Sequence, residues 1–258
     1  MKAKKKYGQN FLIDQNIINQ IISLIDIADN TLVLEIGPGR GALTSQLVKL
    51  NCDLICVEID TDMHKYLSKF ESDKCKIIYN DILTINLKSL LNNGSYDKLI
   101  VIGNLPYYIT SPIMEHLVKS DCKIQEMIFM VQKEVAYRYA AKPCNKDYGY
   151  ISVFLQSFYD INIAINVPNI CFNPPPKVQS AVIKMISNGR RYNGEEEQFF
   201  SFVKEAFHLK RKTLKNNLNM YDWKVIEEFL ITNNLSTTIR SEELSEQLLR
   251  KLFKQINS

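Results

Sequence analysis

The loop at residues 104–107 carries groups suited to methylation of a nucleobase nitrogen. It reads Asn104-Leu105-Pro106-Tyr107. An exocyclic amine is a poor nucleophile because its lone pair is delocalised into the ring. The Asn104 side-chain oxygen and the backbone carbonyl before Pro106 can accept the two N–H bonds of that amine and localise the lone pair. Tyr107 can stack on a base that has been flipped out of its helix. The structural alternative is a Pro-aromatic turn that packs on the core.

A glycine-rich segment at residues 35–41 predicts a cofactor site. Gly37, Gly39 and Gly41 let the backbone turn tightly and approach a ligand without a Cβ in the way. The third glycine comes one residue earlier than in the GxGxxG of dinucleotide-binding proteins, and Pro38 follows the first. This spacing disfavours NAD and FAD and suits S-adenosylmethionine. A lone GxGxG is weak evidence, since many such segments are simply turns.

Two acids follow the next predicted strands. Glu58 is placed to accept hydrogen bonds from both ribose hydroxyls, and Asp81 is placed to accept one from an adenine amino group. Either acid alone would more often be a solvated residue at a strand end. Because the carboxyl ends of parallel strands meet at one edge of a sheet, these acids, the glycine segment and Asn104 together predict a single site.

The elements that must position these residues alternate along the chain. Helical stretches separate apolar runs at 31–36, 54–57, 76–79, 99–103 and 127–131. The alternation predicts an α/β fold with a doubly wound, Rossmann-like sheet that is mostly parallel. The runs at 161–167 and 178–186 have no helix between them, so they predict an antiparallel hairpin at one edge.

The pattern changes after residue 187. A polar, glycine-containing linker leads into helical periods at 195–208, 211–218, 222–232 and 241–253. We therefore expect a methyltransferase domain over residues 1–187 and a small all-α, RNA-binding domain over residues 188–258.

Other features of the composition narrow the class of protein. The six Cys form no CxxC pair and the three His are scattered, so no metal site is expected. There is no signal peptide, and no apolar run reaches the roughly 18 residues of a membrane span. These features predict a soluble, cytoplasmic protein with reduced cysteines, and nothing indicates more than a monomer.

The formal charge of +4 is unevenly distributed. Residues 1–13 carry four Lys and no acid, and residues 204–215 carry five basic residues against Glu205, so each segment nets +4 and the remainder nets −4. Basic segments of this kind are often merely solvated, but they also supply salt-dependent affinity for phosphates. The candidate RNA contacts are Lys4, Lys5, Lys6, Lys177, Arg190, Arg191, Lys210, Arg211, Lys212 and Lys215.

Taken as a set, the motifs resemble those of the ribosomal RNA adenine N6,N6-dimethyltransferases that act on the small subunit. The matching segments are residues 7–12, 35–41, 104–107, 172–180 and 206–214, together with Glu58 and Asp81. The resemblance implies that two adjacent adenines in a hairpin near the 3′ end of that rRNA are dimethylated. It implies S-adenosylmethionine contacts from Asn10, Leu12, Gly37, Glu58, Asp81 and Asn104. It also implies that Phe172 lies across the target base from Tyr107.

Three other functions stay open. The related family that dimethylates large-subunit rRNA more often has Asn-Ile-Pro-Tyr in the catalytic loop, and this chain has Asn-Leu-Pro-Tyr. A ribosome-assembly factor whose binding matters more than its methylation is compatible with the same motifs. A methyltransferase for proteins or small molecules is disfavoured by the catalytic loop and the basic segment 204–215.

Overall fold

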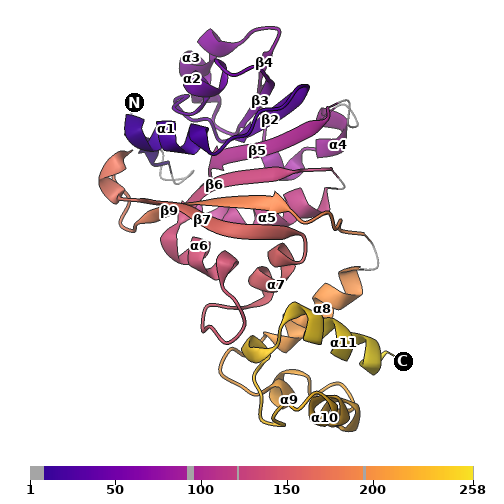
Figure 1. Ribbon diagram of the computed structural model, residues 1–258. Helices are drawn as coiled ribbons and strands as arrows, with labels where there is room; N and C mark the ends of the chain where they lie inside the picture. The colour runs from indigo at the N-terminus through magenta and orange to yellow at the C-terminus, as the bar shows by residue number, and fades with distance from the viewer. Residues whose placement is uncertain (1–8, 92–95, 121, 194–195, 258) are drawn as a thin grey trace. The chain divides into compact units, whose positions relative to one another are not determined.

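The computed structural model describes residues 9–91, 96–120, 122–193 and 196–257 (Figure 1). These residues form two compact units. The first comprises the described residues up to 136 together with 159–191, and the second comprises 137–158 together with the described residues from 192 to 257. The domains predicted from the sequence, 1–187 and 188–258, divide the chain at one point. In the structure, the segment 137–158 belongs to the second unit although it lies within the predicted first domain. The segment departs from the linear division because it folds against the C-terminal helices, as its contacts below show.

The first unit is built on a seven-stranded sheet in the order β4-β3-β2-β5-β6-β9-β7 (Figure 1). The five parallel strands are β2 (Thr31–Ile36), β3 (Asp53–Glu58), β4 (Cys75–Tyr79), β5 (Lys98–Asn104) and β6 (Glu126–Gln132). β9 (Ser180–Ser187) is antiparallel to both β6 and β7 (Tyr159–Val167). The predicted doubly wound sheet with an antiparallel hairpin at one edge is thus confirmed.

The helices of this unit are mostly shorter than their sequence patterns indicate. The pattern after Asp14 extends to about Ile27, but α1 ends at Ser23. Asp14 caps α1 by accepting hydrogen bonds from the backbone N–H groups of Asn16 and Ile17. The other helices of this unit are α2 (Thr44–Leu47), α3 (His64–Leu67), α4 (Leu87–Leu90) and α5 (Thr110–Lys119). α6 (Lys133–Ala140) begins in the first unit and ends in the second.

A second, two-stranded sheet joins the N-terminal segment to the chain before β9. β1 (Phe11–Leu12) pairs antiparallel with β8 (Phe172–Asn173), and Leu12 lies opposite Phe172. The Ile13 N–H extends the pairing by donating to the Cys171 carbonyl at 2.9 Å. Two distant segments of the sequence are therefore held side by side.

The centre of the large sheet is buried on both faces. Leu32, Val33 and Leu34 of β2 have no exposed surface, as expected for a parallel strand covered on both sides. β5 approaches β2 closely at Gly103, where an added Cβ would collide with the Ile36 carbonyl oxygen. A glycine is thus required immediately before Asn104 to bring the two strand ends together.

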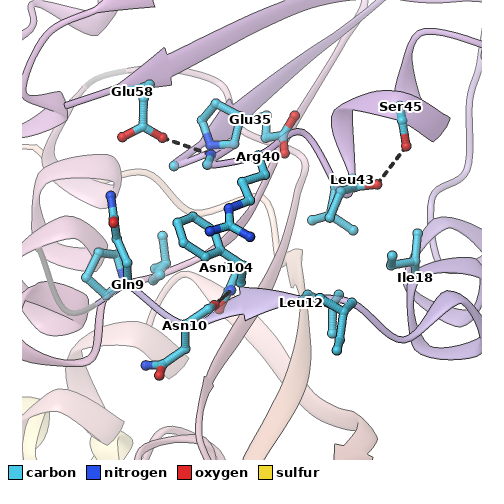
Figure 2. A pocket seen from close by; sticks show the side chains of 18 of the residues that line it. Gln9, Asn10, Leu12, Ile18, Glu35, Arg40, Leu43, Ser45, Glu58 and Asn104 are labelled. Atoms are coloured by element: carbon cyan, nitrogen blue, oxygen red, sulfur yellow. Dashed lines mark hydrogen bonds between the residues drawn. The ribbon is translucent and has the colours of Figure 1, made fainter. Parts of the chain in front are cut away.

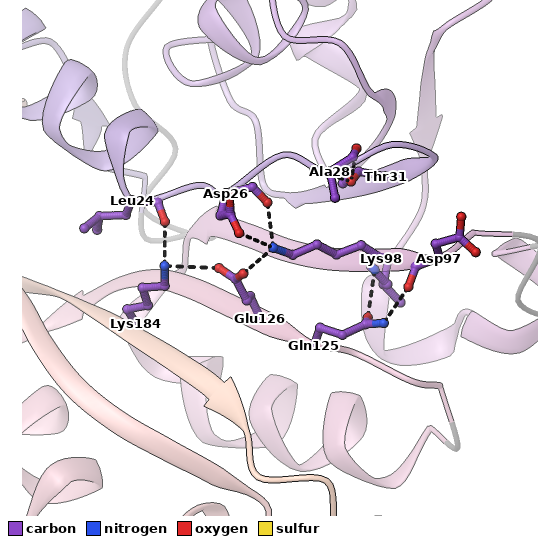
Figure 3. A network of polar contacts seen from close by, with 10 residues as sticks. Leu24, Asp26, Ala28, Thr31, Asp97, Lys98, Gln125, Glu126 and Lys184 are labelled. Carbon is purple, nitrogen blue, oxygen red and sulfur yellow. Dashed lines mark hydrogen bonds and ion pairs between the residues drawn. The ribbon is translucent and has the colours of Figure 1, made fainter.

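A polar network ties the opposite, amino-terminal edge of the sheet together (Figure 3). Glu126 at the start of β6 pairs with Lys98 of β5 at 2.6 Å and with Lys184 of β9 at 3.2 Å. The two ammonium groups also donate to the carbonyls of Asp26 and Leu24 in the segment after α1. The carboxylate thereby links three strands to that segment.

The second unit is helical in its described residues. Its helices are α7 (Tyr150–Gln156), α8 (Glu196–Ala206), α9 (Leu214–Asn217), α10 (Trp223–Thr232) and α11 (Glu246–Ile256). Aromatic side chains form much of its core. The Phe154 and Phe200 rings, for example, pack edge to face with their centroids 4.9 Å apart. No described helix has the length and hydropathy needed to cross a membrane.

Candidate active site

A cavity of about 370 Å³ opens at the carboxyl ends of β2, β3 and β5, within the first unit (Figure 2). Three stretches of chain supply most of its lining: the N-terminal segment 9–13, the glycine segment and the loop after β5. Because the parallel order of the strands puts their carboxyl ends at one edge, residues far apart in sequence converge there.

The glycine segment turns with backbone angles that favour glycine. Gly37 and Gly39 have φ values of +69° and +57°. The Gly37 N–H donates to the Val57 carbonyl at 2.9 Å, which fixes the loop against β3. A Cβ on Gly39 would lie 3.2 Å from the Phe11 ring, so the loop and the N-terminal segment pack with little space to spare.

The N-terminal segment is anchored across the cavity by side chains from three elements. Asn104 Nδ2 donates to the Asn10 carbonyl at 2.9 Å, and Gln9 Nε2 donates to Asp60 Oδ2 at 2.8 Å. The Arg40 guanidinium lies 4.2 Å from the centroid of the Phe11 ring. Figure 2 shows the Arg40 side chain running between Glu58 and Leu12.

Glu58 is almost fully buried at the end of β3. Its two carboxylate oxygens accept hydrogen bonds from the backbone N–H groups of Gly39 and Asp60, each at 2.8 Å. Burial raises the pKa of Glu58, and the nearby Asp60 carboxylate adds to the rise while the two N–H groups oppose it. Each oxygen retains a second lone pair with which to accept a ligand hydroxyl.

Glu35 lies beneath the glycine segment and is 1% exposed. Its Oε2 accepts hydrogen bonds from the Thr44 hydroxyl at 2.7 Å and from the Cys56 thiol at 3.5 Å. Burial raises the pKa of Glu35 to about 7, against the lowering effect of these two donors. The cavity is therefore floored by a carboxyl group that changes charge near neutral pH.

The loop after β5 presents two open acceptors. Asn104 uses its Nδ2 to hold the N-terminal segment, and its Oδ1 accepts no hydrogen bond from the part of the chain that the structure describes. The Leu105 carbonyl likewise accepts no hydrogen bond from the described residues, whereas the Leu105 N–H donates to the Met130 carbonyl at 3.1 Å. Tyr107 is fixed by a 2.8 Å hydrogen bond between its hydroxyl and Ser180 Oγ. Burial raises the pKa of Tyr107, and the hydrogen bond with Ser180 opposes the rise.

The structure brings most of the sequence-predicted site residues to this cavity. Those lining it are Asn10, Leu12, Gly37, Glu58, Asn104, Leu105, Pro106 and Tyr107. Asp81 does not line it: this residue stands just beyond β4, where its Oδ1 caps a short helical turn by accepting from the Leu83 N–H. Phe172 does not line it either, since it is 2% exposed and packs in the core with Leu12.

The predicted RNA contacts lie in several places. Lys4, Lys5 and Lys6 fall outside the described residues. Lys177, Arg190 and Arg191 are exposed in the first unit, and Arg191 borders a separate cavity with Leu32 and Leu99, near the amino-terminal ends of β2 and β5. The predicted contacts Lys210, Arg211, Lys212 and Lys215 are exposed in the second unit.

Sequence reasoning missed several residues that build the site. Arg40 stands inside the glycine segment and Ser180 at the end of the 172–180 motif, yet spacing alone gives no sign that they meet Phe11 and Tyr107. The sequence shows Glu35 near the end of an apolar run, but its hydrogen bonds with Thr44 and Cys56 form only in the folded chain. Among the described residues there is no group of three or more His, Cys, Asp or Glu arranged to hold a metal ion.

Comparisons with known proteins agree with this geometry. Residues 1–258 match the family model described as ribosomal RNA adenine dimethylase. The chain is 40% identical to the ribosomal RNA small subunit methyltransferase A of Mycoplasma mycoides, covering 98% of this chain and 97% of the relative. It is 37% identical to the protein of the same name from Sulfurihydrogenibium, covering 98% and 96%.

Two solved structures share the fold over nearly the whole chain. A dimethyladenosine transferase from Plasmodium falciparum superposes with a TM-score of 0.78 at 24% identity, covering 96% of this chain and 97% of that one. The 23S rRNA methyltransferase ErmE superposes with a TM-score of 0.70 at 22% identity, covering 96% and 100%.

Proposed function

Because this chain belongs to the ribosomal RNA adenine dimethylase family and is thus an S-adenosylmethionine-dependent rRNA adenine dimethyltransferase, we propose that its substrate is small-subunit rRNA. The proposed reaction dimethylates the N6 groups of two adjacent adenines in a hairpin near the 3′ end of that rRNA. The enzyme acts as a cytoplasmic monomer on immature small subunits, without a metal. Support for the small subunit comes from relatives named for that substrate.

The residues at the cavity fit S-adenosylmethionine. When bound, this cofactor supplies an activated methyl group on a sulfonium sulfur. Gly37 and Gly39 would leave room for the end of the cofactor that lies against the loop backbone. Asn10 and Leu12 would cover the cofactor from the N-terminal segment. Glu58 accepts from the ribose hydroxyls with its remaining lone pairs. Asp81 accepts from the adenine amino group at the same carboxyl edge, beyond β4.

The observation that carries the catalytic proposal is the pair of open acceptors at Asn104 and Leu105. Asn104 Oδ1 and the Leu105 carbonyl would accept hydrogen bonds from the two N–H groups of the adenine amine, which would localise the nitrogen lone pair for attack on a methyl group. Pro106 fixes the direction of the preceding carbonyl. Tyr107, fixed by Ser180, stacks on the flipped adenine. Phe172 supplies the opposite face of the base, which requires movement of β8 itself because the Phe172 ring is buried in the core.

An Asn104→Ala variant tests the catalytic proposal. Loss of the Oδ1 acceptor is expected to lower methyl transfer to unmethylated small subunits by at least about a hundredfold, comparable to loss of one donor from an oxyanion hole. Binding to immature subunits should survive, because no RNA-binding cation is removed. Retention of most methyl transfer would contradict the role of Asn104. If methylation is lost while subunit maturation proceeds normally, binding is the more important activity.

A further inference from the structure

A second cavity, of about 280 Å³, lies wholly within the second unit. Its walls come from three segments distant in sequence: residues 138–151 around the start of α7, residues 204–217 from the end of α8 to α9, and residues 241–242. A water molecule in the liquid occupies about 30 Å³, so the cavity has room for a hydrated phosphodiester group.

The cavity is lined by more positive than negative groups. Five cationic side chains border it: Arg138, Lys146, Lys204, Lys210 and Lys212. The two carboxylates on its wall are Asp147 and Glu242, and Glu242 already lies 3.9 Å from Arg240. None of the five cations pairs with a carboxylate among the described residues. Their positive charge is therefore available to a ligand. An anion with several hydrogen-bond acceptors is complementary to it.

Two contacts indicate that the cavity is organised rather than a chance gathering of lysines. The Lys204 ammonium group lies 4.9 Å from the centroid of the Tyr150 ring, which holds the side chain against the cavity wall. Arg138 Nε is buried and has no hydrogen-bond partner in the part of the chain that the structure describes. An unpaired buried donor of a charged group is unfavourable unless a ligand satisfies it.

The cavity floor also has open backbone. Gly149 borders it, and a Cβ built on this glycine would meet nothing within 4 Å. Its φ of −166° is an extended conformation that any residue adopts. The chain can therefore accept a side chain here without strain, which makes Gly149 a place to alter the charge of the cavity without altering the fold.

We propose that this cavity binds a backbone phosphate of the RNA substrate, with residues 138–151 contributing to RNA recognition as directly as the basic segment 204–215. The inference rests on the proposed function and adds Arg138 and Lys146, which lie outside the basic segment 204–215. Phosphate recognition of this kind positions the RNA and carries no sequence information.

Charge substitutions outside the segment 210–215 test the proposal. For Lys146→Gln with Lys204→Gln, the slope of log affinity against log salt should fall in magnitude by about 1 to 2, because each phosphate contact contributes roughly one. Binding is measured with unmethylated small subunits over a series of KCl concentrations. The matched control is Lys251→Gln with Lys254→Gln, which removes two exposed lysines from α11 and should leave the slope unchanged.

Gly149 provides a second, isosteric comparison. Gly149→Asp and Gly149→Asn both place a favourable capping side chain before α7, so neither should unfold the protein. Gly149→Asp should weaken RNA binding severalfold relative to Gly149→Asn, since only the carboxylate repels phosphate. Equal RNA affinity of the two variants, or a wild-type salt slope in the lysine double variant, would overturn the cavity proposal. Failure of the wild-type protein to methylate small subunits would instead overturn the proposed function.

Discussion

Individual residues at the active site divide into those that a sequence pattern exposes and those that only the fold brings into place. Asn104, Glu58 and Gly37 stand at strand ends where spacing alone predicts a ligand, and all three line the cavity. Ser180 and Arg40 gain their roles from contacts with Tyr107 and Phe11, which no local spacing encodes. Phe172 shows the converse, since a motif assigns it to the base while its ring lies in the core.

Glu35 gives a prediction at the residue scale. Its pKa in the folded protein is raised from 4.5 to about 7, so the native state binds the proton more tightly than the unfolded state does. Stability is therefore expected to fall as pH rises from about 4.5 to about 7. The loss approaches about 3 kcal/mol in ligand-free protein, because one pKa unit corresponds to about 1.4 kcal/mol.

Comparison with Glu35→Gln isolates this effect. The amide keeps an acceptor for the Thr44 hydroxyl but does not titrate. Urea unfolding at pH 5 and pH 8 should show the variant gaining stability relative to the natural protein at the higher pH. A difference between the two proteins that does not change with pH would show that Glu35 titrates normally.

Elements were predictable where a pattern ran long enough to be periodic. β2 and β5 are buried on both faces, so each is a continuous apolar run in the sequence. Their predicted bounds were therefore nearly correct. α2 and α3 span only four residues each, too few to show a helical period. The two-residue pairing of β1 with β8 gives no periodic signal at all, although it holds the N-terminal segment beside the cavity.

The network around Glu126 gives a prediction at the element scale. Glu126→Ala leaves Lys98 and Lys184 without their shared carboxylate, although Lys98 keeps the Asp26 carboxylate and carbonyl and Lys184 keeps the Leu24 carbonyl. We expect a loss of about 2–4 kcal/mol in the free energy of unfolding, measured with urea.

An exposed acid in the same sheet supplies the control. Asp160→Ala in β7 should change stability by less than about 0.5 kcal/mol. Since Glu126 lies at the amino-terminal edge and the cavity at the carboxyl ends, methyl transfer per folded molecule should be retained. Equal unfolding midpoints for the two variants would mean that the network contributes nothing to holding the strands.

At the scale of the whole molecule, the charge of +4 is informative only once it is resolved along the chain. The predicted division of the chain was linear, because a change from alternating strands and helices to helices alone is visible in sequence. That 137–158 belongs with the C-terminal helices was not visible, since it follows from packing. The Ser157 hydroxyl, for example, donates a hydrogen bond to Glu246 Oε1 of α11 at 3.3 Å.

The basic segment 204–215 gives the corresponding prediction. Neutralising Lys210, Arg211 and Lys212 together should weaken binding to small subunits at moderate salt and reduce its salt dependence. S-adenosylmethionine affinity, measured by calorimetry, should not change, because these residues lie outside the unit that holds the cofactor cavity. Unchanged RNA affinity would remove this segment from the account of substrate binding.

The most direct test of the central claim is the position and number of methyl groups that the wild-type protein transfers. Unmethylated small subunits and unmethylated large subunits would be incubated separately with labelled S-adenosylmethionine, and the rRNA analysed by mass spectrometry. The account predicts N6,N6-dimethyladenosine at two adjacent adenines near the 3′ end of small-subunit rRNA, and none in the large subunit. Dimethylation of large-subunit rRNA alone, or of a single small-subunit adenine, would contradict it.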